Sequence, residues 1–137
     1  MPPSSSPLIR AFGTSGPPLG LAYLASALEA EGHEVRVVDC IALGYGLAEL
    51  AQELRSFSPD VVGLTATTPS IYDAYRVARL VKAELPDCLV VLGGPHATFM
   101  ASEVLAECPY VDAVVRGEGE LTICDLVNRL ARETSLE

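Results

Sequence analysis

Three short stretches of the sequence combine small and polar residues, and each directly follows an apolar run. They cover residues 65–70, 93–98 and 116–120. Together they offer hydroxyl groups, glycines and peptide N–H donors, which suit a small molecule that carries a phosphate and amide groups. Nothing in the sequence resembles a set of nucleophile, base and acid, so we expect no catalytic residue in this chain.

A pair of glycines, Gly93 and Gly94, ends the apolar run at residues 89–92. Glycine has no Cβ and adopts positive φ angles freely, so a bulky ligand could lie directly against the backbone here. We therefore expect Gly94→Leu to block ligand binding more than it unfolds the domain, because the new side chain would project into the ligand crevice. The alternative is that the pair only forms a turn between a strand and a helix.

Apolar runs and helical patterns alternate along the chain. Strands are predicted at residues 35–39, 61–65, 89–92 and 112–116, and helices at residues 20–31, 47–54, 71–85, 101–107 and 123–130. This repetition predicts an α/β fold, a flavodoxin-like or Rossmann-like three-layer αβα sandwich with a parallel sheet. The loops after parallel strands meet at the edge of the sheet where ligands bind, so the three polar stretches should line one crevice.

The amino-terminal segment, residues 1–18, is rich in Pro and Ser and is predicted to be a loop ahead of a single domain at residues 19–134. A flavodoxin-like sheet has the strand order 2-1-3-4-5, so its first strand is central. Only four strong strands can be predicted, and the first strand is missing or replaced. Either residues 8–12 fill the gap, or a segment exchanged with a second copy fills it and produces a homodimer.

The composition limits the partners that the chain could have. Its 137 residues suit one domain, and half of them are hydrophobic. The net charge of −9 argues against binding to nucleic acid or to an anionic membrane, since both require a cationic surface. No apolar stretch is long enough to span a bilayer, and the amino terminus lacks the pattern of a signal peptide. We therefore expect a cytoplasmic location.

The cysteines of the chain do not form a recognisable motif. Cys40, Cys88, Cys108 and Cys124 are widely and irregularly spaced, so they match neither a zinc site nor a redox pair. We interpret them as reduced, apolar packing residues.

The sequence closely resembles the cobalamin-binding domain at the amino-terminal end of cobalamin-dependent radical S-adenosylmethionine (SAM) enzymes. Three motifs in the order found in that family carry the resemblance: PPLGLAYLA at residues 17–25, GGPHAT at residues 93–98 and VVRGEGE at residues 114–120. The resemblance implies that the chain binds cobalamin (vitamin B12) for methyl transfer or radical chemistry. The compact three-cysteine motif of radical SAM enzymes is absent. The 4Fe-4S cluster and SAM would therefore belong to a catalytic domain that this chain does not contain.

The resemblance also implies which residues bind the cofactor. Threonines lie beside the nucleotide tail of cobalamin, the glycine pair and a further threonine border its base, and a glycine-rich loop faces the corrin ring. In that order they are Thr65, Thr67 and Thr68, then Gly93, Gly94 and Thr98, then Gly117, Glu118 and Gly119, with Pro69, Pro95 and His96 as neighbours in the same loops.

His96 is expected either to contact the nucleotide tail of cobalamin or to stabilise the loop at residues 93–98. It is not expected to bind the cobalt. Better-known cobalamin carriers supply the cobalt ligand from an Asp-x-His-x-x-Gly stretch, which this sequence lacks. We therefore expect no metal ligand from this chain.

Other functions are compatible with the same fold. One is a non-catalytic flavodoxin-like signalling or partner module, although the acidic cluster of a signalling receiver is absent after the strand at residues 61–65. A flavin or nicotinamide enzyme is a weaker alternative, because the phosphate-binding turn after the first strand is absent.

Overall fold

The computed structural model describes residues 8–11, 19–66, 68–117 and 120–135. Its strands form one parallel sheet in the order β2-β1-β3-β4-β5. The strands are β1 (Leu8–Ala11), β2 (Arg36–Asp39), β3 (Val61–Thr65), β4 (Leu89–Gly93) and β5 (Ala113–Val114). This is the expected strand order 2-1-3-4-5, and the α/β sandwich is confirmed.

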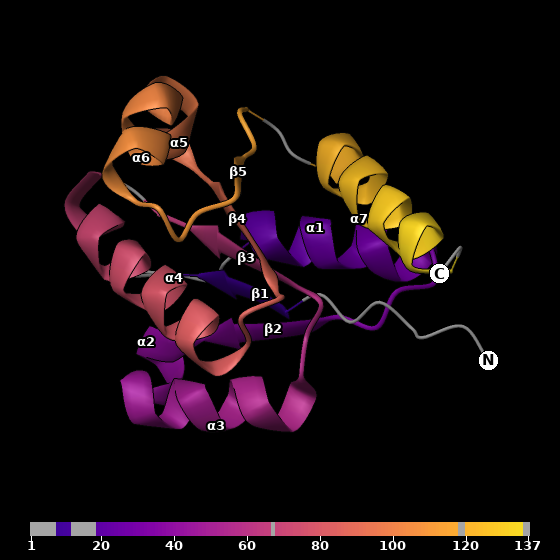
Figure 1. The fold of residues 1–137 in the computed structure, drawn as a ribbon, viewed down its shortest axis with the longest axis horizontal. Helices are drawn as coiled ribbons and strands as arrows, with labels where there is room; N and C mark the ends of the chain where they lie inside the picture. Colours follow the sequence, from indigo (N-terminus) through magenta and orange to yellow (C-terminus); the bar gives the residue numbers. More distant parts are fainter. Residues whose placement is uncertain (1–7, 12–18, 67, 118–119, 136–137) are drawn as a thin grey trace.

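Helices cover both faces of the sheet and produce three layers (Figure 1). They are α1 (Leu19–Ala30), α2 (Cys40–Leu43), α3 (Leu47–Phe57), α4 (Ile71–Glu84), α5 (Pro95–Phe99), α6 (Ala101–Glu107) and α7 (Glu120–Ser135), with a 3-10 turn at Thr68–Ser70. The short helices α2 and α5 were not expected from the sequence. No helix in the described part of the chain has the length and apolar character needed to cross a bilayer.

The first strand comes from the amino-terminal segment of the same chain. Leu8–Ala11 pairs in parallel with β2 on one side and with β3 on the other. The expectation that residues 1–18 form only a loop is therefore wrong, because four of them form the central strand of the sheet. The first of the two alternatives for filling the gap is the one observed, although Phe12 lies outside the described residues.

The core is divided by the sheet into two clusters, because successive side chains of a strand point to opposite faces. One cluster joins Val62 and Leu64 of β3 to buried residues of α3 and α4. The other joins Val61 of the same strand to α1 and α7. Full burial of one Val or Leu side chain contributes about 1.5–3 kcal/mol. A one-residue shift of β3 would exchange the two faces, so burial fixes the register of the strand.

Three of the cysteines belong to this packing. Cys40, Cys88 and Cys108 are buried free thiols, and Cys124 is partly buried. Burial raises the pKa of the Cys88 thiol to about 12, and the Lys82 ammonium group opposes this change only in part. Since the thiolate is the reactive form, a thiol with such a raised pKa is inert at neutral pH. The interpretation as packing residues is confirmed for the three buried cysteines.

Candidate functional site

The loops after β3, β4 and β5 meet at one edge of the sheet, as expected from the fold. Thr65 at the end of β3 is in register with Gly93 at the end of β4. Ala66, which directly follows Thr65, donates its backbone N–H to the carbonyl oxygen of Gly93 over 3.3 Å. The loop after β5 is joined to the same edge by a hydrogen bond from the Gly117 N–H to the Thr98 hydroxyl. The structure therefore brings together residues from all three predicted stretches.

Gly94 supports the neighbouring loop and does not open a space for a ligand. Its φ angle is +98°, a conformation that favours glycine. A Cβ atom on Gly94 would lie 2.6 Å from the Thr65 hydroxyl oxygen and 2.8 Å from the carbonyl oxygen of Ala66. The expectation that a side chain at position 94 would project into the ligand crevice is wrong, because it would collide with the loop after β3.

Gly93 and Gly117 leave the edge of the sheet bare. Among the described residues, a Cβ atom on Gly93 would meet only the carbonyl oxygen of Val115, at an ordinary contact distance of 3.6 Å. A Cβ atom on Gly117, whose φ angle is +70°, would meet no atom of the described residues within 4 Å. These two glycines, and not Gly94, are the positions where a ligand could approach the backbone closely.

His96 connects the loops after β3 and β4. Its ring nitrogen Nδ1 lies 3.1 Å from the hydroxyl oxygen of Thr68, a separation that a hydrogen bond spans. Pro95 and Pro69 are exposed beside this pair, and Pro95 occupies the first turn of α5, where its missing N–H costs nothing. The expected loop-stabilising role of His96 agrees with this contact. Thr67, Glu118 and Gly119 lie outside the described residues.

No metal centre accompanies these loops in the described part of the chain, where no three His, Cys, Asp or Glu side chains group closely enough to hold an ion. The polar groups that the described loops present are hydroxyls, backbone groups, the imidazole of His96 and the exposed guanidinium group of Arg116. They are suited to binding a neutral, amide-rich molecule and its phosphate.

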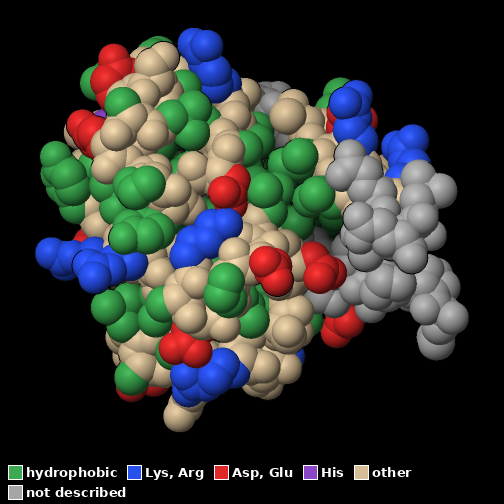
Figure 2. Space-filling view, in the orientation of Figure 1, with side chains coloured by type: hydrophobic (Ala, Val, Ile, Leu, Met, Phe, Trp, Pro, Cys, Tyr) green, Lys and Arg blue, Asp and Glu red, His purple; other side chains and the backbone are tan. Residues whose placement is uncertain are grey.

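Large apolar side chains are exposed in the helices that follow the three loops. Tyr72, Phe99 and Leu121 stand at or just after the loops that follow β3, β4 and β5, and they are 67%, 83% and 88% exposed. Hydrophobic side chains gather at the upper left of Figure 2, where Figure 1 draws α5, α6 and the start of α4. Sequence reasoning missed these residues. The signal that could have found them is a large apolar residue just after a strand's loop, outside the buried stripe of the following helix.

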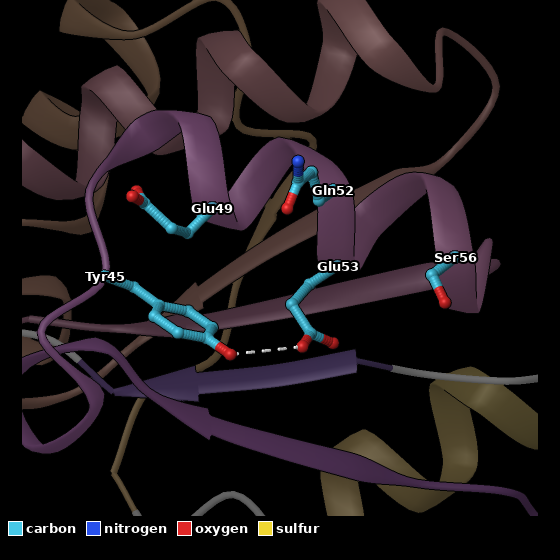
Figure 3. Close-up of a pocket in the computed structure, with 5 residues that line it drawn as sticks. All are labelled: Tyr45, Glu49, Gln52, Glu53 and Ser56. Atoms are coloured by element: carbon cyan, nitrogen blue, oxygen red, sulfur yellow. Dashed lines mark hydrogen bonds between the residues drawn. The ribbon is translucent and has the colours of Figure 1, made fainter.

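A separate hollow of about 180 Å³ lies along α3, away from the three loops (Figure 3). It is lined by Tyr45, Glu49, Gln52, Glu53 and Ser56. The carboxylate of Glu53 pairs with Arg36 over 2.8 Å and accepts a long hydrogen bond from the Tyr45 hydroxyl. None of the predicted site residues lines this hollow. Its two carboxylates, Glu49 and Glu53, are already engaged in hydrogen bonds, so we assign it no ligand.

The family of the chain follows from comparison with known proteins. Residues 5–127 match the family model described as the B12 binding domain. The chain therefore belongs to the B12-binding domain family, and the resemblance stated from its motifs is confirmed. Cobalamin is accordingly the cofactor of this domain.

Two curated relatives share substantial identity with the chain. An uncharacterized methyltransferase of Pyrococcus horikoshii is 47% identical over 137 residues, which are 100% of this chain and 30% of that protein. An anaerobic magnesium-protoporphyrin IX monomethyl ester cyclase of Rubrivivax gelatinosus is 44% identical over 112 residues, which are 81% of this chain and 20% of that protein. The chain thus spans less than a third of the length of these relatives.

A solved structure has the same fold. It is the radical SAM methyltransferase TsrM from Kitasatospora setae with cobalamin and an iron–sulfur cluster bound. It superposes with a TM-score of 0.83 at 23% identity, over 95% of this chain and 25% of that chain. At this identity the likeness concerns the fold alone.

The residues at the edge of the sheet fit a cobalamin. The bare backbone at Gly93 and Gly117 leaves room for a bulky group. The hydroxyl groups of Thr65 and Thr68 lie in the adjoining loop after β3 and can donate to the amide and phosphate groups of such a ligand.

Proposed function

We propose that this chain is the cobalamin-binding domain of a radical SAM enzyme of the methyltransferase type. The observation that carries the proposal is the meeting of three loops at one edge of the sheet, with bare backbone at Gly93 and Gly117. The match of residues 5–127 to the B12 binding domain identifies cobalamin as the cofactor, and we assign it to this edge of the sheet.

In this proposal different loops contact different parts of the cofactor. The hydroxyls of Thr65 and Thr68 and the backbone N–H groups of the loops hold the nucleotide tail, because neutral donors suit its phosphate and amides. The exposed side chains of Tyr72, Phe99 and Leu121 contact the corrin ring. His96 holds the loop after β4 against Thr68 and does not bind the cobalt. Cobalamin supplies the methyl-transfer or radical chemistry when it is bound, and the residues of this chain bind and orient it.

The proposal includes a second domain. The curated relatives are more than three times as long as this chain, so they have room for a catalytic unit that would carry the iron–sulfur cluster and SAM. In this proposal that unit covers the cofactor beside the exposed apolar side chains of Tyr72, Phe99 and Leu121. A cytoplasmic location is part of the same proposal. The homodimer is a prediction for the case in which a segment exchanged with a second copy fills the gap that Leu8–Ala11 occupies here, and light scattering would test it.

The test is a binding experiment with the purified chain. We expect hydroxocobalamin to stay with the protein through gel filtration, with corrin absorbance in the protein peak at about one equivalent and measurable heat in calorimetry. Flavin mononucleotide and NADH are the controls, and we expect neither to be retained. A sample that is folded by circular dichroism yet retains no corrin absorbance and gives no heat would contradict the proposal.

A further inference from the structure

The outer face of α1 carries no charged side chain along most of its length. α1 lies beside α7 on one face of the sheet (Figure 1), and its residues Leu24 and Leu28 pack into the core on that face. Tyr23, Ser26 and Ala30 are exposed instead, and Tyr23 is 64% exposed. Residues three and four positions apart share one side of a helix, so these three form one line, which we call the α1 strip.

The other long helices have a different outer face. α4 and α7 each carry an exposed ion pair, Asp73–Arg76 in α4 and Asp125–Arg129 in α7. α1 has no charged residue before Glu29, and none of its side chains makes an ion pair within the described part of the chain. A helix without a charged face is typically buried. The pattern therefore indicates that a further surface covers the α1 strip.

The ends of α1 lack the charges that usually stabilise a helix. An acidic residue in the first turn and a basic residue in the last turn interact favourably with the helix dipole. α3 and α4 have both, Glu49 with Arg55 and Asp73 with Lys82. α1 has no acidic residue in its first turn and no basic residue in its last turn, where the exposed Glu29 stands instead. A second helix with the same charges, running antiparallel to α1, would bring an acidic residue toward the first turn of α1.

We propose that the α1 strip is the interface between two copies of this chain, with the two α1 helices antiparallel across a two-fold axis near Ser26. Under this symmetry Tyr23 of one copy contacts Ala30 of the other, a large side chain against a small one. Glu29 of each copy then lies toward the amino-terminal half of the other α1, where the positive end of the helix dipole attracts it. Small side chains at positions 26 and 30 let the two helices approach closely.

The charge of the chain favours this face for self-association. At a net charge of −9, two copies repel each other over most of their surface. The α1 strip brings no charged group of one copy against a like charge of the other. α1 has 12 residues and is about 18 Å long, so the interface is small and the dimer is weak. This dimer requires neither the cofactor nor an exchanged strand, since Leu8–Ala11 stays in its own sheet.

The test compares two substitutions that make the same change in charge. Ser26→Arg places two guanidinium groups against each other across the two-fold axis. Thr122→Arg, at an exposed position of the neighbouring helix α7, is the matched control. Arginine forms helices better than serine or threonine, so both variants should fold, and circular dichroism checks this. Sedimentation velocity and light scattering over a range of concentrations measure the dissociation constant of the dimer.

We expect the average mass of the wild-type chain to rise with concentration from 14.5 kDa toward twice that value. The dissociation constant should increase about 100-fold in Ser26→Arg, because like charges meet at the interface. It should stay near the wild-type value in Thr122→Arg. Both variants lower the net negative charge equally, so a weaker dimer in Ser26→Arg alone reports the position of the charge. If Ser26→Arg does not fold, Glu29→Lys provides a second test, with an expected increase of about 3- to 10-fold.

A wild-type chain that stays monomeric at every concentration would overturn the proposal, and the α1 strip would then belong to a contact with another domain. A dimer that persists unchanged in Ser26→Arg would also overturn it, because the two copies would then meet elsewhere, as in an exchange of strands. Equal weakening in Ser26→Arg and Thr122→Arg would show that the added charge matters and its position does not, which contradicts the α1 strip as the interface.

Discussion

At the scale of single residues, Gly94 is the position where backbone conformation and close packing coincide. Its φ angle is +98°, and a Cβ atom there would lie 2.6 Å from the Thr65 hydroxyl oxygen. Gly32 has a similar φ angle of +90°, but a Cβ on it would meet nothing within 4 Å. Gly93 has ordinary space around it. Alanine substitutions at these three glycines therefore distinguish the destabilisation caused by backbone strain from that caused by a collision with neighbouring atoms.

We expect Gly94→Ala to lower the free energy of unfolding more than Gly32→Ala does. Strain in this region of φ costs about 1–3 kcal/mol, which both variants incur. The collision with Thr65 and Ala66 adds to it only at Gly94. Gly93→Ala should change stability by less than about 1 kcal/mol. Urea unfolding of the three variants measures these differences, and equal losses at positions 94 and 32 would show that the contact with the loop after β3 is unimportant.

At the scale of the secondary-structure elements, Asp112 joins α4, β4 and β5 at the edge of the sheet opposite the three loops. Its carboxylate accepts hydrogen bonds from Lys82 Nζ over 2.6 Å and from the backbone N–H of Val90 over 2.8 Å. Lys82 also donates to the carbonyl oxygen of Cys88 over 2.7 Å. Since β5 has only two residues in the sheet, these contacts anchor its start.

We expect Asp112→Ala to destabilise the domain by about 1–3 kcal/mol, because a partly buried N–H and an ammonium group lose their acceptor. The control is Asp73→Ala, which breaks an exposed pair with Arg76 on α4 and should cost less than about 1 kcal/mol. Thermal or urea unfolding measures both. If the two substitutions had equal effects, the contacts of Asp112 would be no more than another surface ion pair.

At the scale of the whole molecule, the sheet depends on a strand of four residues. Leu8–Ala11 pairs with β2 and β3 at once, so its backbone joins β2 to the other three strands of the sheet. Each buried backbone group left without a partner costs about 1–3 kcal/mol. The total stability of a single domain is about 5–15 kcal/mol, so few such losses can be tolerated.

We therefore expect Ile9→Pro to abolish cooperative unfolding, because proline cannot donate to the ladder and is excluded from central strands. Ser5→Pro, upstream of the strand, is the control and should leave the unfolding transition in place. Circular dichroism during thermal unfolding provides the measurement. A normal transition in Ile9→Pro would mean that the sheet does not need this strand.

Much of this architecture could be predicted from the sequence. β3 at Val61–Thr65 and α6 at Ala101–Glu107 coincide with their predicted ranges. The other three predicted strands differ by one or two residues at their ends, and β5 is the shortest because only Ala113 and Val114 pair with β4. These elements are predictable because their apolar residues repeat with the period of a strand or a helix, and that pattern is local. The three loops follow from the order of the elements.

The tertiary structure alone decided the rest. The sequence offers residues 8–12 as only one of two alternatives for the first strand, and Leu8–Ala11 takes that place because β2 and β3 supply backbone partners on both sides. The side chain that would project from Gly94 meets Thr65 and Ala66, which lie 28 or more positions earlier in the chain. Thr98 binds Gly117, which lies 19 positions later. Contacts between distant residues depend on how the strands are arranged in the sheet, and no local period in the sequence records that arrangement.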